Sequence, residues 1–124
     1  MNSFDCDGVI YFEGKPGVRP GFPDIIVTGR SFEEEEETIK WLRKHQIYNV
    51  VYFNPLPFSE KTRESSGIHK GNTLKKLIED GHEIEFHFED DPVQIEEIKK
   101  ILPDLKIVHV SSNFVELENM RRVD

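Results

Sequence analysis

The sequence has one cysteine, Cys6, no long hydrophobic run and a deficit of basic residues, and each shortage excludes a class of protein. A single cysteine cannot form a disulfide within the chain, so a disulfide-stabilised secreted scaffold is excluded. No apolar stretch approaches the roughly 20 residues of a membrane-spanning helix, and no signal-peptide pattern is present. We therefore expect a cytoplasmic protein that does not contact a membrane.

Lysine and arginine together number 16 against 24 aspartates and glutamates, which gives a formal net charge of −8. A negative field of this kind repels a phosphate backbone, so long nucleic acid is not an expected partner. The exception would be a local basic edge formed by Lys61, Arg63, His69, Lys70, Lys75 and Lys76. The length of 124 residues fits one domain, which we expect to span residues 1–124.

Short β-type runs alternate with helical patterns along the chain, which predicts parallel strands joined by helices. The expected strands cover residues 1–4, 25–27, 48–53, 83–88 and 105–110. The expected helices cover residues 32–45, 70–80, 92–102 and, more loosely, 114–120. We therefore predict a three-layer, Rossmann-like α/β fold with a five-stranded, mainly parallel sheet and no cap domain.

Two of the expected helices begin with capping residues. Ser31, with Glu34 three positions later, has the pattern of a capping box. Asp91 is followed by Pro92 and then by Gln94, which is typical of an N-cap before a proline at the first helical position. Both helices are therefore expected to start directly after a strand, where open α/β sheets collect ligands.

Two of the expected strands fit a buried sheet poorly. The first, residues 1–4, is short and polar for a central strand. In the fourth, Glu83, Glu85 and His87 form a polar face. This face would be exposed, covered by the terminal segment or part of a subunit contact, so a homo-oligomer is one expectation.

Two aspartates, Asp5 and Asp7, follow the first expected strand and are separated by one residue. This spacing lets one carboxylate attack phosphorus while the other transfers the proton of the leaving group. Gly8 would let the chain turn close to a phosphate. Cys6, between two carboxylates, is not expected to become a thiolate nucleophile. The alternative interpretation is that both aspartates only form a turn.

Thr28 and Gly29 follow the second expected strand and offer a hydroxyl and backbone N–H groups that can bind phosphate oxygens. The neighbouring Arg30 is either a substrate-binding residue or a surface residue. Lys70, near the start of its expected helix, would meet the positive end of the helix dipole, a placement that makes sense if it faces an anion. Lys61 is a competing candidate, and a solvated side chain is the alternative interpretation of Lys70.

The acidic run Glu89, Asp90 and Asp91 follows the fourth expected strand and would hold a hard divalent cation. Mg²⁺ prefers one or two carboxylates together with water and substrate oxygens, and Asp90 is the first choice as its ligand. Asp91 is either a further ligand or only the N-cap of the next helix. A histidine-based transition-metal site is not expected, because His82 and His87 would point to opposite faces of one strand.

In order and spacing, residues 5–9, Thr28, Lys70 and the pair at 90–91 resemble the four motifs of the haloacid dehalogenase superfamily. The resemblance implies that Asp5 is the nucleophile, that Asp7 is the general acid and base, and that Thr28 binds phosphate. It implies that Lys70 holds the charges of nucleophile and phosphate together.

The same resemblance implies an Mg²⁺ ion held by the carboxylates of Asp5 and Asp90 and by the backbone carbonyl of Asp7, with Asp91 as a further candidate. Gly8 and Gly29 would contribute backbone N–H groups. The gaps between the motifs leave room only for a small flap at residues 11–17, so the chain resembles a capless member with an open site. Such members tend to act on large substrates or to oligomerise.

These implications predict an Mg²⁺-dependent phosphomonoester hydrolase that acts through an aspartyl-phosphate on a phosphorylated small molecule or a nucleotide. The alternatives are a nucleotide or nucleic-acid-end phosphatase, and a catalytically silent phosphate-binding module. A signalling receiver domain is a further alternative, but it would place its phosphoacceptor aspartate after the third strand, where this chain has Asn54.

Overall fold

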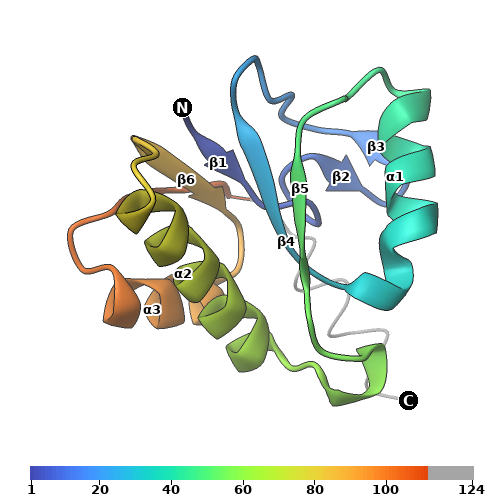
Figure 1. Ribbon diagram of the computed structural model, residues 1–124. Coiled ribbons are helices and arrows are strands. Elements are labelled where there is room, and N and C mark those ends of the chain that lie inside the picture. Colours follow the sequence, from blue (N-terminus) through green and yellow to red (C-terminus); the bar gives the residue numbers. More distant parts are fainter. Residues whose placement is uncertain (112–124) are drawn as a thin grey trace.

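The computed structural model describes residues 1–111, which form a parallel sheet with helices on both faces (Figure 1). The sheet has five strands in the order β5-β4-β1-β6-β7, and each of its pairings is parallel. The strands are β1 (Ser3–Phe4), β4 (Ile25–Ser31), β5 (Val51–Asn54), β6 (Phe86–Glu89) and β7 (Lys106–His109). This arrangement confirms the predicted α/β class and the five-stranded parallel sheet.

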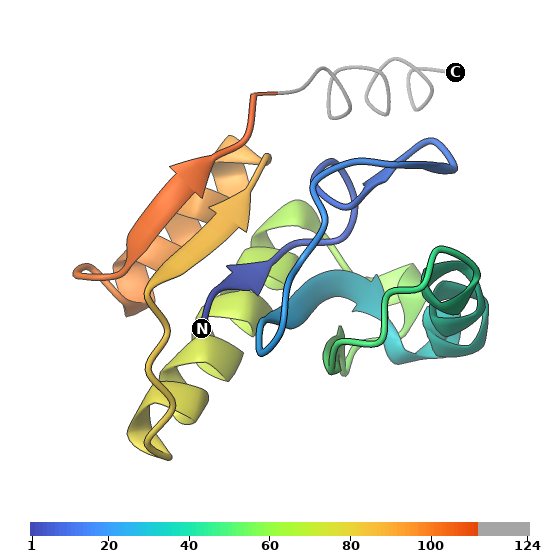
Figure 2. The same cartoon turned by 90° about the horizontal axis from the view of Figure 1, so that it is seen from above.

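The helices form the two outer layers (Figures 1 and 2). On one face, α2 (Arg63–Glu79) packs against α3 (Pro92–Ile101). On the other face lies α1 (Glu35–Lys44), which directly follows the 3₁₀ turn η1 (Phe32–Glu34). A second 3₁₀ turn, η2 (Phe58–Glu60), lies between β5 and α2. The predicted three-layer arrangement is therefore present.

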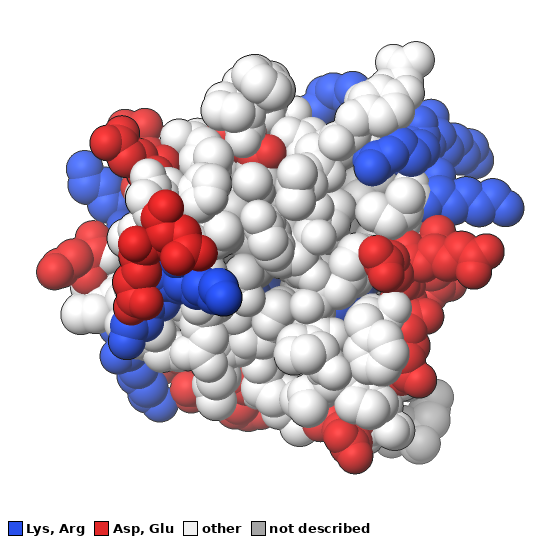
Figure 3. Space-filling model, in the orientation of Figure 1, with Lys and Arg blue, Asp and Glu red and all other residues white. Residues whose placement is uncertain are grey.

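A small hairpin on the α1 side of the sheet lies within the flap expected at residues 11–17. Its strands, β2 (Tyr11–Phe12) and β3 (Lys15–Pro16), pair in antiparallel fashion. The Tyr11 ring packs edge-on against the Trp41 ring of α1, with 4.9 Å between ring centroids. Charged side chains lie mainly around the edge of the face shown in Figure 3. No described helix is both long and apolar enough to cross a membrane.

Two apolar clusters hold the layers together, one on each face of the sheet. Phe4 and Ile26 pack with Leu42 of α1, whereas Val27 packs with Leu74 of α2. Ile26 and Val27 are neighbours in β4, and successive side chains of a strand point to opposite faces. Buried on both faces, β4 therefore contains a continuous apolar run.

The central strand β1 is buried although it is short and polar. Ser3 is 0% exposed and Phe4 is 4% exposed, because β4 and β6 pair with the two edges of β1. The Phe4 ring stacks on that of Phe88, with 4.5 Å between the centroids. Just past the strand, the Asp5 N–H donates to the Phe88 carbonyl at 3.0 Å. Neighbouring strands, and not the composition of residues 1–4, decide this burial.

Two expectations about local structure are wrong. The helix expected at 70–80 begins at Arg63, because Thr62 and Ser65 form a reciprocal capping box. Lys70 therefore lies in the middle of α2, and the helix-dipole argument for its position fails. The polar face expected on the fourth strand is not continuous, because His87 within β6 is fully buried.

Other local expectations are confirmed. Ser31 and Glu34 form the predicted capping box, and Asp91 is the N-cap of α3 with Pro92 at the first turn. The helix expected at 114–120 lies outside the described residues.

Candidate active site

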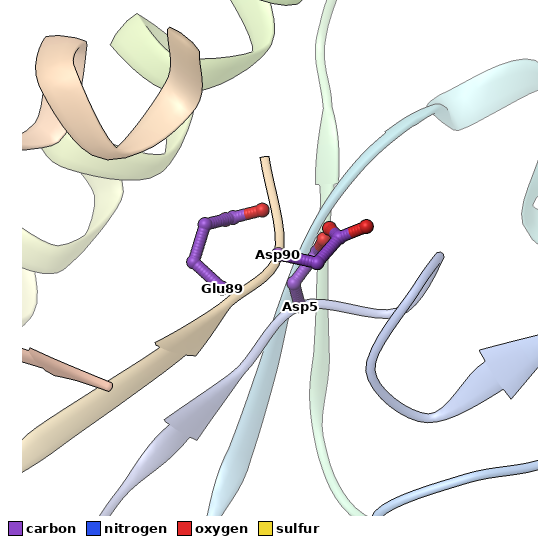
Figure 4. Close-up of side chains that lie close together, drawn as sticks. All are labelled: Asp5, Glu89 and Asp90. Atoms are coloured by element: carbon purple, nitrogen blue, oxygen red, sulfur yellow. The ribbon is translucent and has the colours of Figure 1, made fainter. Parts of the chain in front are cut away.

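Three acidic side chains meet at the carboxyl edge of the sheet, beside its central strand (Figure 4). Asp5 directly follows β1, Glu89 is the last residue of β6, and Asp90 comes next. One ligand oxygen from each lies within 4.8 Å of the others. The chain passes from β1 to β4 and β5 on one side and returns to β6 and β7 on the other. The cluster therefore lies at the switch point where open α/β sheets bind ligands.

Lys70 reaches this acidic cluster from the middle of α2, and its side chain is 1% exposed. Its Nζ lies 2.8 Å from Asp5 Oδ1 and 2.8 Å from Glu89 Oε1, and it also donates to Gln94 Oε1. Burial opposes the ammonium charge, but the charges of Asp5 and Glu89 outweigh it and raise the pKa of Lys70. Lys70 is therefore a fixed cation whose three N–H bonds each have an oxygen partner.

Asp5 is buried and accepts hydrogen bonds from both its own loop and α2. Its Oδ1 accepts from the Cys6 N–H at 2.8 Å and lies 2.8 Å from Lys70 Nζ. Burial, followed by the charge of Glu89, raises the pKa of Asp5 well above its ordinary value, while Lys70 opposes the rise. Additional positive charge beside Asp5 would favour its ionised form.

Asp90 is 6% exposed, and its Oδ2 has no hydrogen-bond partner among the described residues. Burial, followed by the charge of Asp5, raises the pKa of Asp90 to about 8. A buried carboxylate oxygen without a donor is costly unless a cation or a proton satisfies it. This oxygen therefore marks the point at which the cluster lacks positive charge.

Gly8 makes room for the Asp90 carboxylate. Its φ is 83°, and a Cβ at this position would lie 1.9 Å from Asp90 Oδ2. Its N–H, expected from the sequence to bind phosphate, donates to the Tyr11 carbonyl at 2.9 Å, and phosphate binding by Gly8 stays a prediction. The glycine is needed for close approach and for the left-handed backbone.

Glu89 was expected only as part of the acidic run 89–91 that would hold a divalent cation, with Asp90 preferred as the ligand, and its contact with Lys70 was not predicted. Its Oε1 accepts from Lys70 and lies 3.1 Å from His87 Nε2. Burial raises the pKa of Glu89, and Lys70 opposes the rise. The available signal was its spacing of two residues from His87, which places both side chains on one face of the strand.

Asp7 lies outside the acidic cluster and is paired with Arg30. Its two carboxylate oxygens accept from Arg30 Nε at 2.9 Å and from Arg30 Nη2 at 2.7 Å. The Arg30 guanidinium also donates to Thr38 Oγ1 at 3.1 Å and lies over the Tyr11 ring, 4.7 Å from its centroid. Arg30, expected either to bind substrate or to lie at the surface, is here the partner of Asp7.

Thr28 and Gly29 lie in β4, where the register with β5 shifts between Val27 and Ser31. Thr28 is fully buried, and its Oγ1 accepts from the Arg30 N–H at 3.0 Å. Gly29 packs against α2, since a Cβ there would lie 2.9 Å from Ser66 Oγ. Close packing therefore requires a glycine at this position, and its expected role in phosphate binding stays a prediction.

Asp91 has structural partners for its carboxylate. It accepts from the Val93 N–H at 2.9 Å as an N-cap and from Arg63 at 3.0 and 2.6 Å. Burial opposes ionisation, but the hydrogen bonds from Arg63 and from Val93 outweigh it and lower the pKa of Asp91. Within the described residues, Asp91 is not part of the group that could hold a metal ion.

Much of the expected basic edge is neutralised by acidic partners. Lys61 pairs with Glu34 at 2.9 Å, and Arg63 pairs with Asp91 at 2.6 Å. Lys70 is buried among carboxylates. Lys61, the competing candidate for the third motif, therefore lies in a separate ion pair.

The acidic cluster has the chemistry of a site for a hard cation. Asp5, Glu89 and Asp90 offer only carboxylate oxygens, the ligands that Mg²⁺ and similar ions prefer. The Lys70 ammonium contacts two of the three carboxylates, and Asp90 Oδ2 has no donor within residues 1–111. The residues present therefore fit a divalent cation.

No family model, curated protein or solved structure matches this chain. The functional interpretation therefore depends on the geometry of the acidic cluster, together with the order of the four sequence segments.

Proposed function

We propose that this protein is an Mg²⁺-dependent phosphomonoester hydrolase in which Asp5 is the nucleophile. The observation that carries the proposal is that Asp5 lies 2.8 Å from the Lys70 ammonium and also shares a cluster with Asp90, whose Oδ2 has no hydrogen-bond partner among the described residues. A phosphate monoester brings two negative charges, and its reaction needs positive charge fixed on both sides of the attacking carboxylate. The location at the switch point of the sheet supports the same conclusion.

In the first step, a carboxylate oxygen of Asp5 attacks phosphorus and the bond to the ester oxygen breaks. The ester oxygen leaves with the electron pair of that bond and takes a proton from Asp7, which must be released from Arg30 and protonated before this step. In the second step, water attacks the phosphorus of the aspartyl-phosphate and gives a proton to Asp7. Phosphate leaves, and the Asp5 carboxylate is restored.

Lys70 contributes by holding a fixed charge against Asp5, so that the carboxylate stays oriented while charge develops on the phosphoryl group. The carboxylates of Asp5 and Asp90 would hold the magnesium ion. When bound, Mg²⁺ would supply positive charge that offsets the carboxylates and the phosphoryl oxygens.

Asp7 can exchange a proton only when Arg30 gives up at least one of the two hydrogen bonds that it donates to this carboxylate. Arg30 is part-buried against Tyr11, so substrate would have to reorient the guanidinium within a confined space. This requirement makes Arg30 a candidate ligand for the incoming phosphate once Asp7 is released.

The proposal is tested with a panel of phosphorylated metabolites and nucleotides, with Mg²⁺ or with a chelator. We expect phosphate release that needs Mg²⁺ and disappears in Asp5→Asn, while Asp5→Asn remains folded. Asp104→Asn, an identical change at an exposed turn, is the matched control and should retain activity. Chelator-resistant turnover, or full activity of Asp5→Asn, would refute the assignment.

A further inference from the structure

A buried polar chain leads from the acidic cluster toward the interior of the sheet. Ser3 on β1 lies beside His87 on β6, and Ser3 Oγ is 2.8 Å from His87 Nδ1. His87 Nε2 is 3.1 Å from Glu89 Oε1, the oxygen that accepts from Lys70 at 2.8 Å. Ser3, His87 and Glu89 are each 0% exposed. These contacts form a continuous hydrogen-bonded network from Ser3 to Lys70, made of protein groups alone.

The contacts of Glu89 and His87 favour one arrangement of the protons along this network. Glu89 Oε1 accepts from Lys70, and Glu89 Oε2 accepts from the Asp91 N–H at 3.4 Å, so both oxygens act as acceptors. With Glu89 ionised, His87 Nε2 carries the proton of this contact and donates it to Glu89 Oε1. A neutral ring with its proton on Nε2 has an unprotonated Nδ1, which lies 2.8 Å from Ser3 Oγ. Its Nδ1 therefore accepts from the Ser3 hydroxyl.

Glu89 also lies close enough to the site to become a ligand of a bound cation. One of its oxygens lies within 4.8 Å of oxygens of Asp5 and Asp90, so a Glu89 carboxylate released from Lys70 could turn toward a cation bound there. If Glu89 turned in this way, Lys70 would lose one of its hydrogen-bond acceptors, and the negative charge beside the cation would increase. The contact with His87 opposes this movement, because turning away would leave a buried N–H without an acceptor.

We infer that His87 is a positioning residue whose Nε2–H holds Glu89 on Lys70 and out of the ligand set of the cation, with Ser3 selecting the required tautomer. Because Glu89 stays bound to Lys70, the Lys70 ammonium remains in contact with Asp5. The effect on turnover rests on the proposed phosphatase activity, whereas the arrangement of the hydrogen bonds does not.

The arrangement is tested first without substrate, by heteronuclear NMR of the imidazole nitrogens and of the Lys70 ammonium group. We expect His87 to be neutral at pH 7 with its proton on Nε2, and the Lys70 ammonium protons to be protected from exchange. In His87→Leu this protection should be lost. A proton on Nδ1, a charged ring, or unchanged protection in His87→Leu would overturn the inference.

The effect on turnover is tested with His87→Leu and His87→Gln. Leucine removes the donor, and kcat should fall about 10–100-fold, with KM and the affinity for Mg²⁺ not weakened. Glutamine can place an N–H near the position of Nε2 and should recover most of kcat. The same two changes at the exposed His82 are the controls and should have no effect.

A merely structural role gives a different pattern. In that case His87→Leu and His87→Gln would lower stability and kcat together, without recovery in the glutamine variant, and the inference would fail. Should His87→Leu not fold, Ser3→Ala replaces it, and a mixture of ring tautomers is expected; an unchanged tautomer overturns the role of Ser3. A wild-type protein without phosphatase activity refutes the proposed function alone, because the NMR result still decides the role of His87.

Discussion

Replacing Asp90 with asparagine tests the acidic cluster most directly, because it removes one charge with little change in shape. The Asp90 carboxyl has an ordinary pKa of 3.8 and a pKa of about 8 in the folded protein, since burial and then the charge of Asp5 oppose its ionisation. The folded state therefore holds this proton more tightly than the unfolded state. Its contribution to stability is complete below pH 3.8 and is lost as the pH rises toward 8.

The size of this effect follows from the shift. Each pKa unit corresponds to about 1.4 kcal/mol, so between pH 3.8 and pH 7 the wild-type protein without metal should lose up to about 4 kcal/mol of stability. The asparagine introduced by this change cannot ionise, but its buried amide has few partners, which costs about 1–3 kcal/mol. In the presence of a chelator, Asp90→Asn should therefore be more stable than wild type by about 1–3 kcal/mol at pH 7 and no more stable near pH 4.

Urea unfolding between pH 4 and pH 8, with a chelator or with Mg²⁺, measures both parts of the prediction. Mg²⁺ at about 100 times its dissociation constant should stabilise wild type by about 2.7 kcal/mol and should not stabilise Asp90→Asn. Asp104→Asn should respond to Mg²⁺ as wild type does. If Asp90→Asn keeps the full response to Mg²⁺, or if the stability of metal-free wild type does not fall with rising pH, the reasoning is refuted.

Three further substitutions each test one contact at or beside the acidic cluster. Lys70→Met should lower the free energy of unfolding in urea at pH 7 by about 3–5 kcal/mol, because the buried carboxylates of Asp5 and Glu89 lose their cation; a cost near zero would contradict the importance of these two ion pairs. Gly8→Ala should weaken Mg²⁺ binding about tenfold or more in calorimetry by displacing Asp90, whereas Gly14→Ala, at a similar positive φ with nothing within 4 Å, should leave it intact. Asp91→Ala should cost about 1–2 kcal/mol through loss of the N-cap, and weakened Mg²⁺ binding would instead make Asp91 a ligand.

Local sequence patterns predicted the elements of the fold well where the signal itself is local. The capping box at Ser31 and the N-cap at Asp91 formed as expected, because both depend on residues within one helical turn. The start of α2 was mispredicted, since Thr62 and Ser65 make a capping box without the usual Glu or Gln.

The residues of the candidate site were likewise predictable from sequence only in part. Asp5 and Asp90 could be proposed from sequence, because each directly follows a predicted strand and parallel strands end at a common edge. The ion pair of Glu89 with Lys70 could not be predicted from sequence, because Lys70 comes from a different layer of the fold. The pairing of Asp7 with Arg30 likewise joins two segments that are separate in sequence.

By itself, the sequence determined the alternation of strands and helices, the points at which two of the helices begin, and the acidic character of two strand ends. These properties depend on periodicity and on contacts between near neighbours in the chain. Only the tertiary structure decided that β1 lies between β4 and β6, which buries Ser3 against His87 across a separation of 84 residues and gathers Asp5, Asp90 and Lys70. The physical reason is that strand order and layer packing set which distant side chains share a buried site, and in that low-dielectric setting each charge depends on its neighbours.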